Sequence, residues 1–125
     1  MEVKTSTKEK FHVITVNIAH LTVNMTEELC RQLTPYLQSD PKNIVLKLGG
    51  VKSMEEEGAE YLAKTQQQFY EGGASFVICE LEPELETVLD SQDMLEILNV
   101  TPTESEAWDI VQMEEIEREL LGDED

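Results

Sequence analysis

The sequence predicts a single α/β domain with a mostly parallel central sheet of about four to five strands and about four helices. Its length of 125 residues fits one ordinary domain with one hydrophobic core. Short segments rich in branched apolar residues alternate with longer segments of helical periodicity. Two of the short segments, 43–48 and 75–81, are apolar on both faces, as central strands of a parallel sheet are. This alternation predicts right-handed crossovers, with helices packed against the sheet.

The N-terminal part of the chain predicts two strands and a helix. Residues 11–18 (FHVITVNI) alternate between two faces as a strand does, and residues 2–6 are expected to add a strand at the sheet edge. Apolar residues then recur at helical spacing over 25–38. Asn24, three residues before Glu27, stands where a helix cap is expected, and a proline-containing turn ends the helix.

The middle of the chain predicts a buried strand, a helix and a second buried strand. Residues 43–48 (NIVLKL) form the first strand, which ends at Gly49-Gly50. A helix is expected from near Met54 to Gly72-Gly73, before the strand of 75–81. The helix side that faces the sheet is expected to consist of Gly58, Ala59, Leu62, Ala63, Gln66, Phe69 and Tyr70.

The C-terminal part predicts two helices. A short helix opens at Glu82-Pro83, with proline at its first position. The last helix starts at Thr103, which forms a capping-box pattern with Glu106. The apolar side of this helix is expected to consist of Ala107, Trp108, Val111, Ile116 and Leu120.

Acidic residues concentrate at the C-terminal end of the chain. Residues 104–125 contain ten acidic side chains and one basic one, Arg118. This surface is either a solvated outer face or a docking surface for a basic partner. We expect one domain over 1–115 and an acidic extension of the last helix over 116–125.

The composition excludes several classes of partner. Nine basic and 27 acidic residues give a formal charge of −18, which repels nucleic acids and anionic lipid surfaces. No apolar run approaches the roughly 20 residues that a membrane-spanning helix needs, so no direct membrane insertion is expected. The first ten residues lack a secretory pattern, and we expect a cytoplasmic protein. Cys30 and Cys79 are expected to be buried and free, without a metal site, and no cofactor is implied.

The segment VKSMEEEGAEYLAK, residues 51–64, places three glutamates where a strand gives way to a helix. Ser53 and Glu56 fit a capping box, and acidic side chains in a first turn interact favourably with the helix dipole. Neither effect requires three successive carboxylates, because like charges so close together repel each other.

The stretch NIVLKLGGVKSMEEEG resembles the core motif of STAS domains, the family of bacterial anti-sigma factor antagonists. In that motif a hydrophobic strand, a short turn and Met/Phe-Asp-Ser-Ser/Thr-Gly lead into a helix. The resemblance extends over roughly residues 10–115 and includes FVICEL, EPELETVLDSQDMLEIL and NVTPTESEAWDIV. It implies a STAS-like fold for the whole domain.

Aligned with this motif, Met54 and Gly58 match in residue type. Glu55 stands at the aspartate, Glu56 at the first serine, and Glu57 at the phosphorylatable serine or threonine. The resemblance therefore implies that a permanent carboxylate at Glu57 replaces a hydroxyl that related proteins modify reversibly. A phosphoserine has a charge of about −1.5 to −2 and three acceptor oxygens, so glutamate would imitate the modified state only in part.

The function that this resemblance implies is non-catalytic regulation through protein-protein contacts, as in an anti-sigma factor antagonist that lacks its phosphorylation switch. Its partner would be a regulatory protein, either an anti-sigma factor or a serine kinase-like protein. The expected partner-binding residues are Gly50, Ser53, Met54, Glu55, Glu56, Glu57, Gly58 and Tyr61.

Two other functions remain open at this stage. The first is a STAS-type cytoplasmic subunit of an ABC lipid transport system, whose partner would be the transporter ATPase. The second is an enzyme that uses the glutamates as acid and base. Catalysis is disfavoured because neighbouring side chains on a helix point about 100° apart rather than converging.

Overall fold

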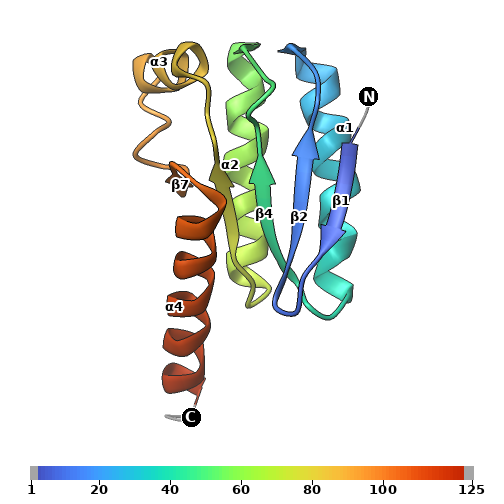
Figure 1. Ribbon diagram of the computed structural model, residues 1–125, viewed down its shortest axis with the longest axis vertical. Coiled ribbons are helices and arrows are strands. Elements are labelled where there is room, and N and C mark those ends of the chain that lie inside the picture. The colour runs from blue at the N-terminus through green and yellow to red at the C-terminus, as the bar shows by residue number, and fades with distance from the viewer. Residues whose placement is uncertain (1–2, 123–125) are drawn as a thin grey trace.

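The computed structural model describes residues 3–122, which form a five-stranded sheet covered by helices on both faces (Figure 1). The strand order of this sheet is β1-β2-β4-β6-β7. The strands β3 and β5 form a separate two-stranded sheet. The strands are β1 (Val3–Thr7), β2 (Phe11–Val16), β3 (His20–Leu21), β4 (Asn43–Lys47), β5 (Ser53–Met54), β6 (Phe76–Cys79) and β7 (Val100–Thr101). The helices are α1 (Val23–Leu33), the short 3₁₀ helix η1 (Thr34–Gln38), α2 (Glu56–Glu71), α3 (Pro83–Ser91) and α4 (Glu104–Gly122). This architecture confirms the predicted α/β class.

The three central strands of the sheet are parallel. Val45 of β4 pairs with Val13 of β2 on one side and with Val77 of β6 on the other. β7 is also parallel to its neighbour, whereas the edge strand β1 is antiparallel to β2. The predicted N-terminal edge strand is therefore confirmed, and the sheet is mostly parallel.

The two faces of the sheet support two separate cores. On one face, Ile14, Ile44 and Ile78 pack in a large cluster to which α1, α2 and α3 contribute. On the other face, a smaller cluster forms around Val45 and includes residues of α4. The members of this smaller cluster are Phe11, Val13, Val45, Val77, Cys79, Ala107 and Val111.

Helix α1 begins earlier than predicted and ends in a 3₁₀ turn. The side chain of Thr22, not that of Asn24, caps the helix by accepting a hydrogen bond from the Met25 amide at 3.1 Å. Thr22 can do so because its backbone is still extended. Pro35 lies at the start of η1, where its missing N–H breaks the α-helical pattern.

Helix α2 packs against the sheet with most of the predicted residues. Phe69 is fully buried, and Gly73 follows the helix with a positive φ of 76°. The prediction that Tyr70 faces the core is wrong, because its side chain is 73% exposed. Thr65, which the pattern did not include, is buried instead.

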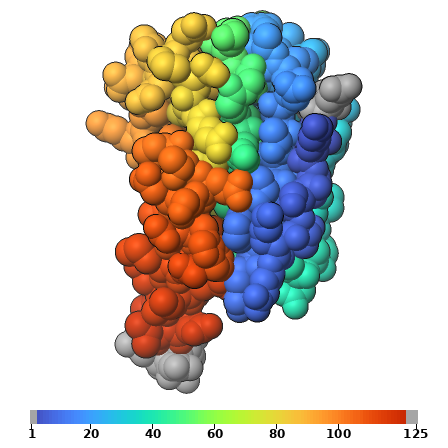
Figure 2. Space-filling view, viewed as in Figure 1, coloured from blue at the N-terminus to red at the C-terminus, as the bar shows by residue number. Residues whose placement is uncertain are grey.

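Helix α4 confirms one part of its prediction and contradicts another. The hydroxyl of Thr103 accepts a hydrogen bond from the Glu106 amide at 3.1 Å, as the capping pattern indicated. Ala107 and Val111 are buried, but Ile116 and Leu120 are 57% and 63% exposed and do not face the core. Both lie on the side of α4 opposite to Val111, because the step of five residues from Val111 to Ile116 turns the helix by about 140°. The second half of α4 also projects beyond the body of the domain (Figures 1 and 2).

Two further features of the described residues concern the cysteines and the helices. Cys30 and Cys79 are buried and free, as predicted. Within residues 3–122, no helix combines the length and the apolar character that crossing a membrane would require.

Candidate functional site

The motif that the sequence analysis singled out lies at a corner built by the short strands β3 and β5. The carbonyl of Ala19 accepts hydrogen bonds from the amides of Lys52 and Ser53 at 2.8 and 3.1 Å. The Glu55 amide donates to the carbonyl of Leu21 at 2.9 Å. These bonds hold the segments that precede α1 and α2 together, so the two helices begin side by side.

The predicted capping box of Ser53 and Glu56 is wrong. Ser53 lies in β5, two residues before the N-cap residue Glu55, because pairing with β3 keeps the chain extended through Met54. The Ser53 hydroxyl is instead hydrogen-bonded to Nδ1 of His20 at 2.6 Å. No pattern in the sequence indicated this contact, because only the pairing of β3 with β5 brings the two residues together.

Glu55 connects the starts of the two helices. Its own position is the N-cap of α2, but its side chain makes no capping bond there. Its Oε1 atom accepts a hydrogen bond from the amide of Val23, the first residue of α1, at 2.6 Å. The carboxylate therefore lies at the positive end of the α1 dipole and satisfies an amide that the helix itself cannot.

Glu56 and Glu57 occupy the first two positions of α2, and both side chains are exposed. No ion pair within residues 3–122 involves either of them. Their carboxylates lie near the positive end of the α2 dipole, which stabilises negative charge there. The exposed position leaves both carboxylates available to a partner.

A hollow of about 360 Å³ adjoins Glu57. It is lined by Glu57, Glu60, Tyr61 and Lys64 of α2 and by Val23 of α1. Tyr61 is half-buried, and a hydrogen bond with Glu27 and the charge of that carboxylate raise the pKa of its phenol. Tyr61 is among the residues expected from the sequence, whereas Val23, Glu60 and Lys64 are not. The helical spacing of Lys64 from Tyr61 and Glu57 was the signal that could have found it.

Two of the expected site residues are buried and serve packing. The Met54 side chain is only 6% exposed and belongs to the main core. Gly58 is buried where α1 and α2 approach closely, and a Cβ atom there would lie 3.0 Å from Thr26 Oγ1 and 3.1 Å from Met54 Cγ. A larger residue at this position would therefore require Thr26 and Met54 to shift.

Gly50 lies in the exposed turn between β4 and β5. A Cβ atom at this position would lie 3.3 Å from Oδ1 of Asn17, which follows β2. The two loops that leave the central strands thus approach each other beside the corner.

The three carboxylates at the corner differ in their surroundings. The Glu55 carboxylate is bonded to a backbone amide, and Glu56 and Glu57 are adjacent on one helical turn rather than opposed. No group of three or more His, Cys, Asp or Glu residues in the described part of the chain is arranged to hold a metal ion. Burial raises the pKa of both thiols, that of Cys79 to about 12, so both remain protonated at neutral pH.

Comparisons with known proteins agree with this architecture. A Thermotoga maritima protein assigned as an anti-sigma factor antagonist superimposes with a TM-score of 0.76 at 17% identity, over 88% of this chain and 94% of that one. The anti-sigma factor antagonist SpoIIAA in its unphosphorylated form gives a TM-score of 0.70 at 14% identity, over 89% and 96%. The Bacillus SpoIIAA structure in the phosphorylated form gives 0.62 at 15% identity, over 88% and 99%.

Another similar structure contains a glutamate in place of a serine. Moorella thermoacetica RsbS with a serine-to-glutamate substitution gives a TM-score of 0.70 at 13% identity, over 90% of this chain and 96% of that one. No curated protein sequence matches the chain significantly. The family model described as the STAS domain matches residues 3–107. The chain therefore belongs to the STAS domain family.

Proposed function

We propose that this STAS domain is a non-catalytic regulatory module that binds a partner protein at the start of α2, with Glu57 as a fixed negative charge. Family membership and the fold shared with anti-sigma factor antagonists support a regulatory interaction. We further propose that the partner is an anti-sigma factor or a serine kinase-like protein, and that the interaction takes place in the cytoplasm.

The observation that supports this proposal most directly is the position of Glu57. It is exposed in the first turn of α2, directly after the strand-to-helix corner, and it borders a hollow. The resemblance to the STAS motif implies that related proteins carry the phosphorylatable hydroxyl at this position. A carboxylate there supplies about half of the charge of a phosphate at all times. Binding would therefore depend on the abundance of this protein rather than on its phosphorylation.

The electrostatics of the corner specify what the partner must provide. A partner that covers Glu57 must remove water from its carboxylate, which is unfavourable unless a cation or several hydrogen-bond donors replace the water. Glu56 and Glu60 add negative charge at the same place, whereas Lys64 lies at the far side of the hollow. We therefore expect an arginine or lysine of the partner to contact Glu57.

The test is affinity purification from the native cell extract, with mass spectrometry of the recovered proteins. The wild-type chain is compared with Glu57→Ser, which restores the hydroxyl, and with Glu84→Ser as the matched control. Glu84 holds the second position of α3, as Glu57 does in α2, so both changes remove the same first-turn charge from a helix.

We expect a specific regulatory protein to be recovered by the wild type and by Glu84→Ser, and in a clearly different amount by Glu57→Ser. Recovery of no specific protein, together with unchanged behaviour of Glu57→Ser, would contradict the proposal. Recovery of a membrane ATPase in place of a regulatory protein would support the subunit of an ABC lipid transport system instead.

A further inference from the structure

The second half of α4 exposes an apolar stripe to solvent. Of the six large hydrophobic side chains that are highly exposed in residues 3–122, four lie here: Met113, Ile116, Leu120 and Leu121, with exposed fractions of 57–66%. Met113, Ile116 and Leu120 are spaced by three and four residues, so they lie on one face of the helix. This is the spacing with which one helix packs along another.

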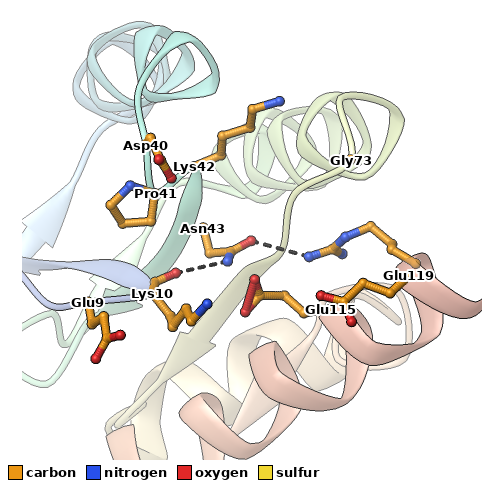
Figure 3. Close-up of a pocket in the computed structure, with 10 residues that line it drawn as sticks. Glu9, Lys10, Asp40, Pro41, Lys42, Asn43, Gly73, Glu115 and Glu119 are labelled. Atoms are coloured by element: carbon orange, nitrogen blue, oxygen red, sulfur yellow. Dashed lines mark hydrogen bonds between the residues drawn. The ribbon is translucent and has the colours of Figure 1, made fainter. Parts of the chain in front are cut away.

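The stripe is on the side of α4 that faces away from the sheet. Ala107 and Val111 are buried against the sheet, and Arg118, seven residues after Val111, lies on the same side. The guanidinium of Arg118 donates to Ser75 Oγ at 3.2 Å and to Asn43 Oδ1 at 3.4 Å. Figure 3 shows Asn43 in the hollow at the base of the sheet, where these contacts are made. Arg118 therefore fixes the rotation of the projecting helix and leaves the stripe uncovered.

The charged side chains of the second half of α4 are mostly negative, although Lys10 and Lys42 line the same hollow as Glu119. Residues 112–121 contain four glutamates, and Arg118, the one basic side chain among them, is directed to the sheet. Glu117 and Glu119, both exposed, flank the stripe on its two sides. An occupant of this surface must therefore combine apolar anchors with positive charge.

A second copy of this chain does not meet that requirement. Two such helices would bring their flanking glutamates together, in molecules of formal charge −18 each. Four exposed side chains also supply only a part of the roughly 800 Å² per partner that a stable dimer of globular proteins buries. An anionic membrane surface is repelled for the same electrostatic reason.

We propose that the second half of α4 is a docking surface for a basic amphipathic helix of a partner protein. Apolar side chains of that helix would pack on Met113, Ile116 and Leu120, while its lysines or arginines would lie beside Glu117 and Glu119. The match to the STAS family model ends at residue 107, so this surface lies outside the part of the chain that the family model covers. The inference is independent of the function proposed for the start of α2, which lies at the other end of the domain (Figure 1).

The first test measures binding of a synthetic helix by fluorescence anisotropy. The probe is a labelled peptide of about three heptads with leucine at the core positions and lysine beside them. The full chain is compared with the double variant Ile116→Gln/Leu120→Gln, because glutamine favours a helix as well as the residues it replaces. The matched control is Tyr70→Gln/Ile97→Gln, which removes two other exposed apolar side chains.

We expect the wild type and the control to bind the peptide equally, and the α4 double variant to bind at least about tenfold more weakly. Circular dichroism melting of all three proteins checks that the fold is unchanged, as the exposure of these side chains predicts. Equal binding by the α4 double variant, or absence of binding by the wild type, would overturn the proposal.

The second test exchanges the charges. The variant Glu117→Lys/Glu119→Lys should prefer a peptide in which glutamate replaces the lysines, whereas the wild type should prefer the lysine peptide. Equal affinity of the wild type for both peptides would show that charge does not select the occupant and would overturn the proposal. So would analytical ultracentrifugation showing a dimer of the wild type that is lost in Ile116→Gln/Leu120→Gln, because the occupant would then be a second copy.

Discussion

Replacement of Glu55 by alanine should destabilise the domain even though its side chain is exposed. The carboxylate accepts a hydrogen bond from the Val23 amide at 2.6 Å, at the first residue of α1. Loss of a side chain that satisfies a helix-start amide costs about 1 kcal/mol, and loss of a negative charge there costs a further 0.3–1 kcal/mol, approximately. We therefore expect the free energy of unfolding to fall by about 1–2 kcal/mol, and the Tm to fall by roughly 3–8 °C for a domain of this size.

Urea denaturation followed by circular dichroism measures this effect. Glu55→Gln retains an oxygen that can accept the Val23 hydrogen bond but removes the charge, so it should show about half of the loss or less. Glu56→Ala is the control, because this adjacent carboxylate is exposed and makes no hydrogen bond to the described residues. The reasoning is refuted if Glu55→Ala is as stable as the wild type, or if Glu56→Ala is equally destabilised.

Two further predictions concern packing and pH. Gly58→Ala should lower the free energy of unfolding by about 1–3 kcal/mol in the same urea assay, because its Cβ would lie 3.0 Å from Thr26 Oγ1; an unchanged midpoint would contradict the close contact of α1 and α2. Stability should also fall as the pH rises above about 9, because burial raises the pKa of Cys79 from 9.0 to about 12 and the unfolded chain loses this proton first. The raised pKa of Lys47, caused by its hydrogen bond with Glu104, acts in the same direction. Thermal melts between about pH 7 and 11 measure this slope, which should be smaller in Cys79→Ala; a flat profile would exclude the effect.

The elements that the sequence predicted well are those with strong local patterns. The segments around β4 and β6 are apolar on both faces because helices cover both sides of the sheet. β3 and β5 could not be predicted, since each has two residues and exists only through pairing between segments about 33 residues apart, as in the contact of His20 with Ser53. Because this pairing keeps Ser53 and Met54 extended, α2 starts only at Glu56 and the expected cap by Ser53 does not form.

Helical spacing also cannot decide which side of a helix meets the rest of the protein. In α4, Ala107 and Val111 face the sheet, whereas Ile116 and Leu120 belong to a second apolar face on the opposite side. Both sets recur at helical intervals, and the predicted apolar side therefore included all four residues. The step of five residues from Val111 to Ile116 turns the helix by about 140° and places the two sets on different sides, and only the position of the sheet decides which side is covered (Figure 1).

The three consecutive glutamates are compatible with folding because the chain changes conformation between them. Glu55 is extended and directs its carboxylate to the start of α1, whereas Glu56 and Glu57 are in the first turn of α2. The Glu55 carboxylate therefore lies at the positive end of the α1 dipole, and those of Glu56 and Glu57 lie at the positive end of the α2 dipole. This favourable interaction offsets much of the repulsion among the three carboxylates. Within residues 3–122 the exposed Glu57 side chain makes no ion pair, so its charge has its largest energetic effect when a partner excludes water from it. Glu55 should therefore govern the stability of this domain, and Glu57 its affinity for a partner.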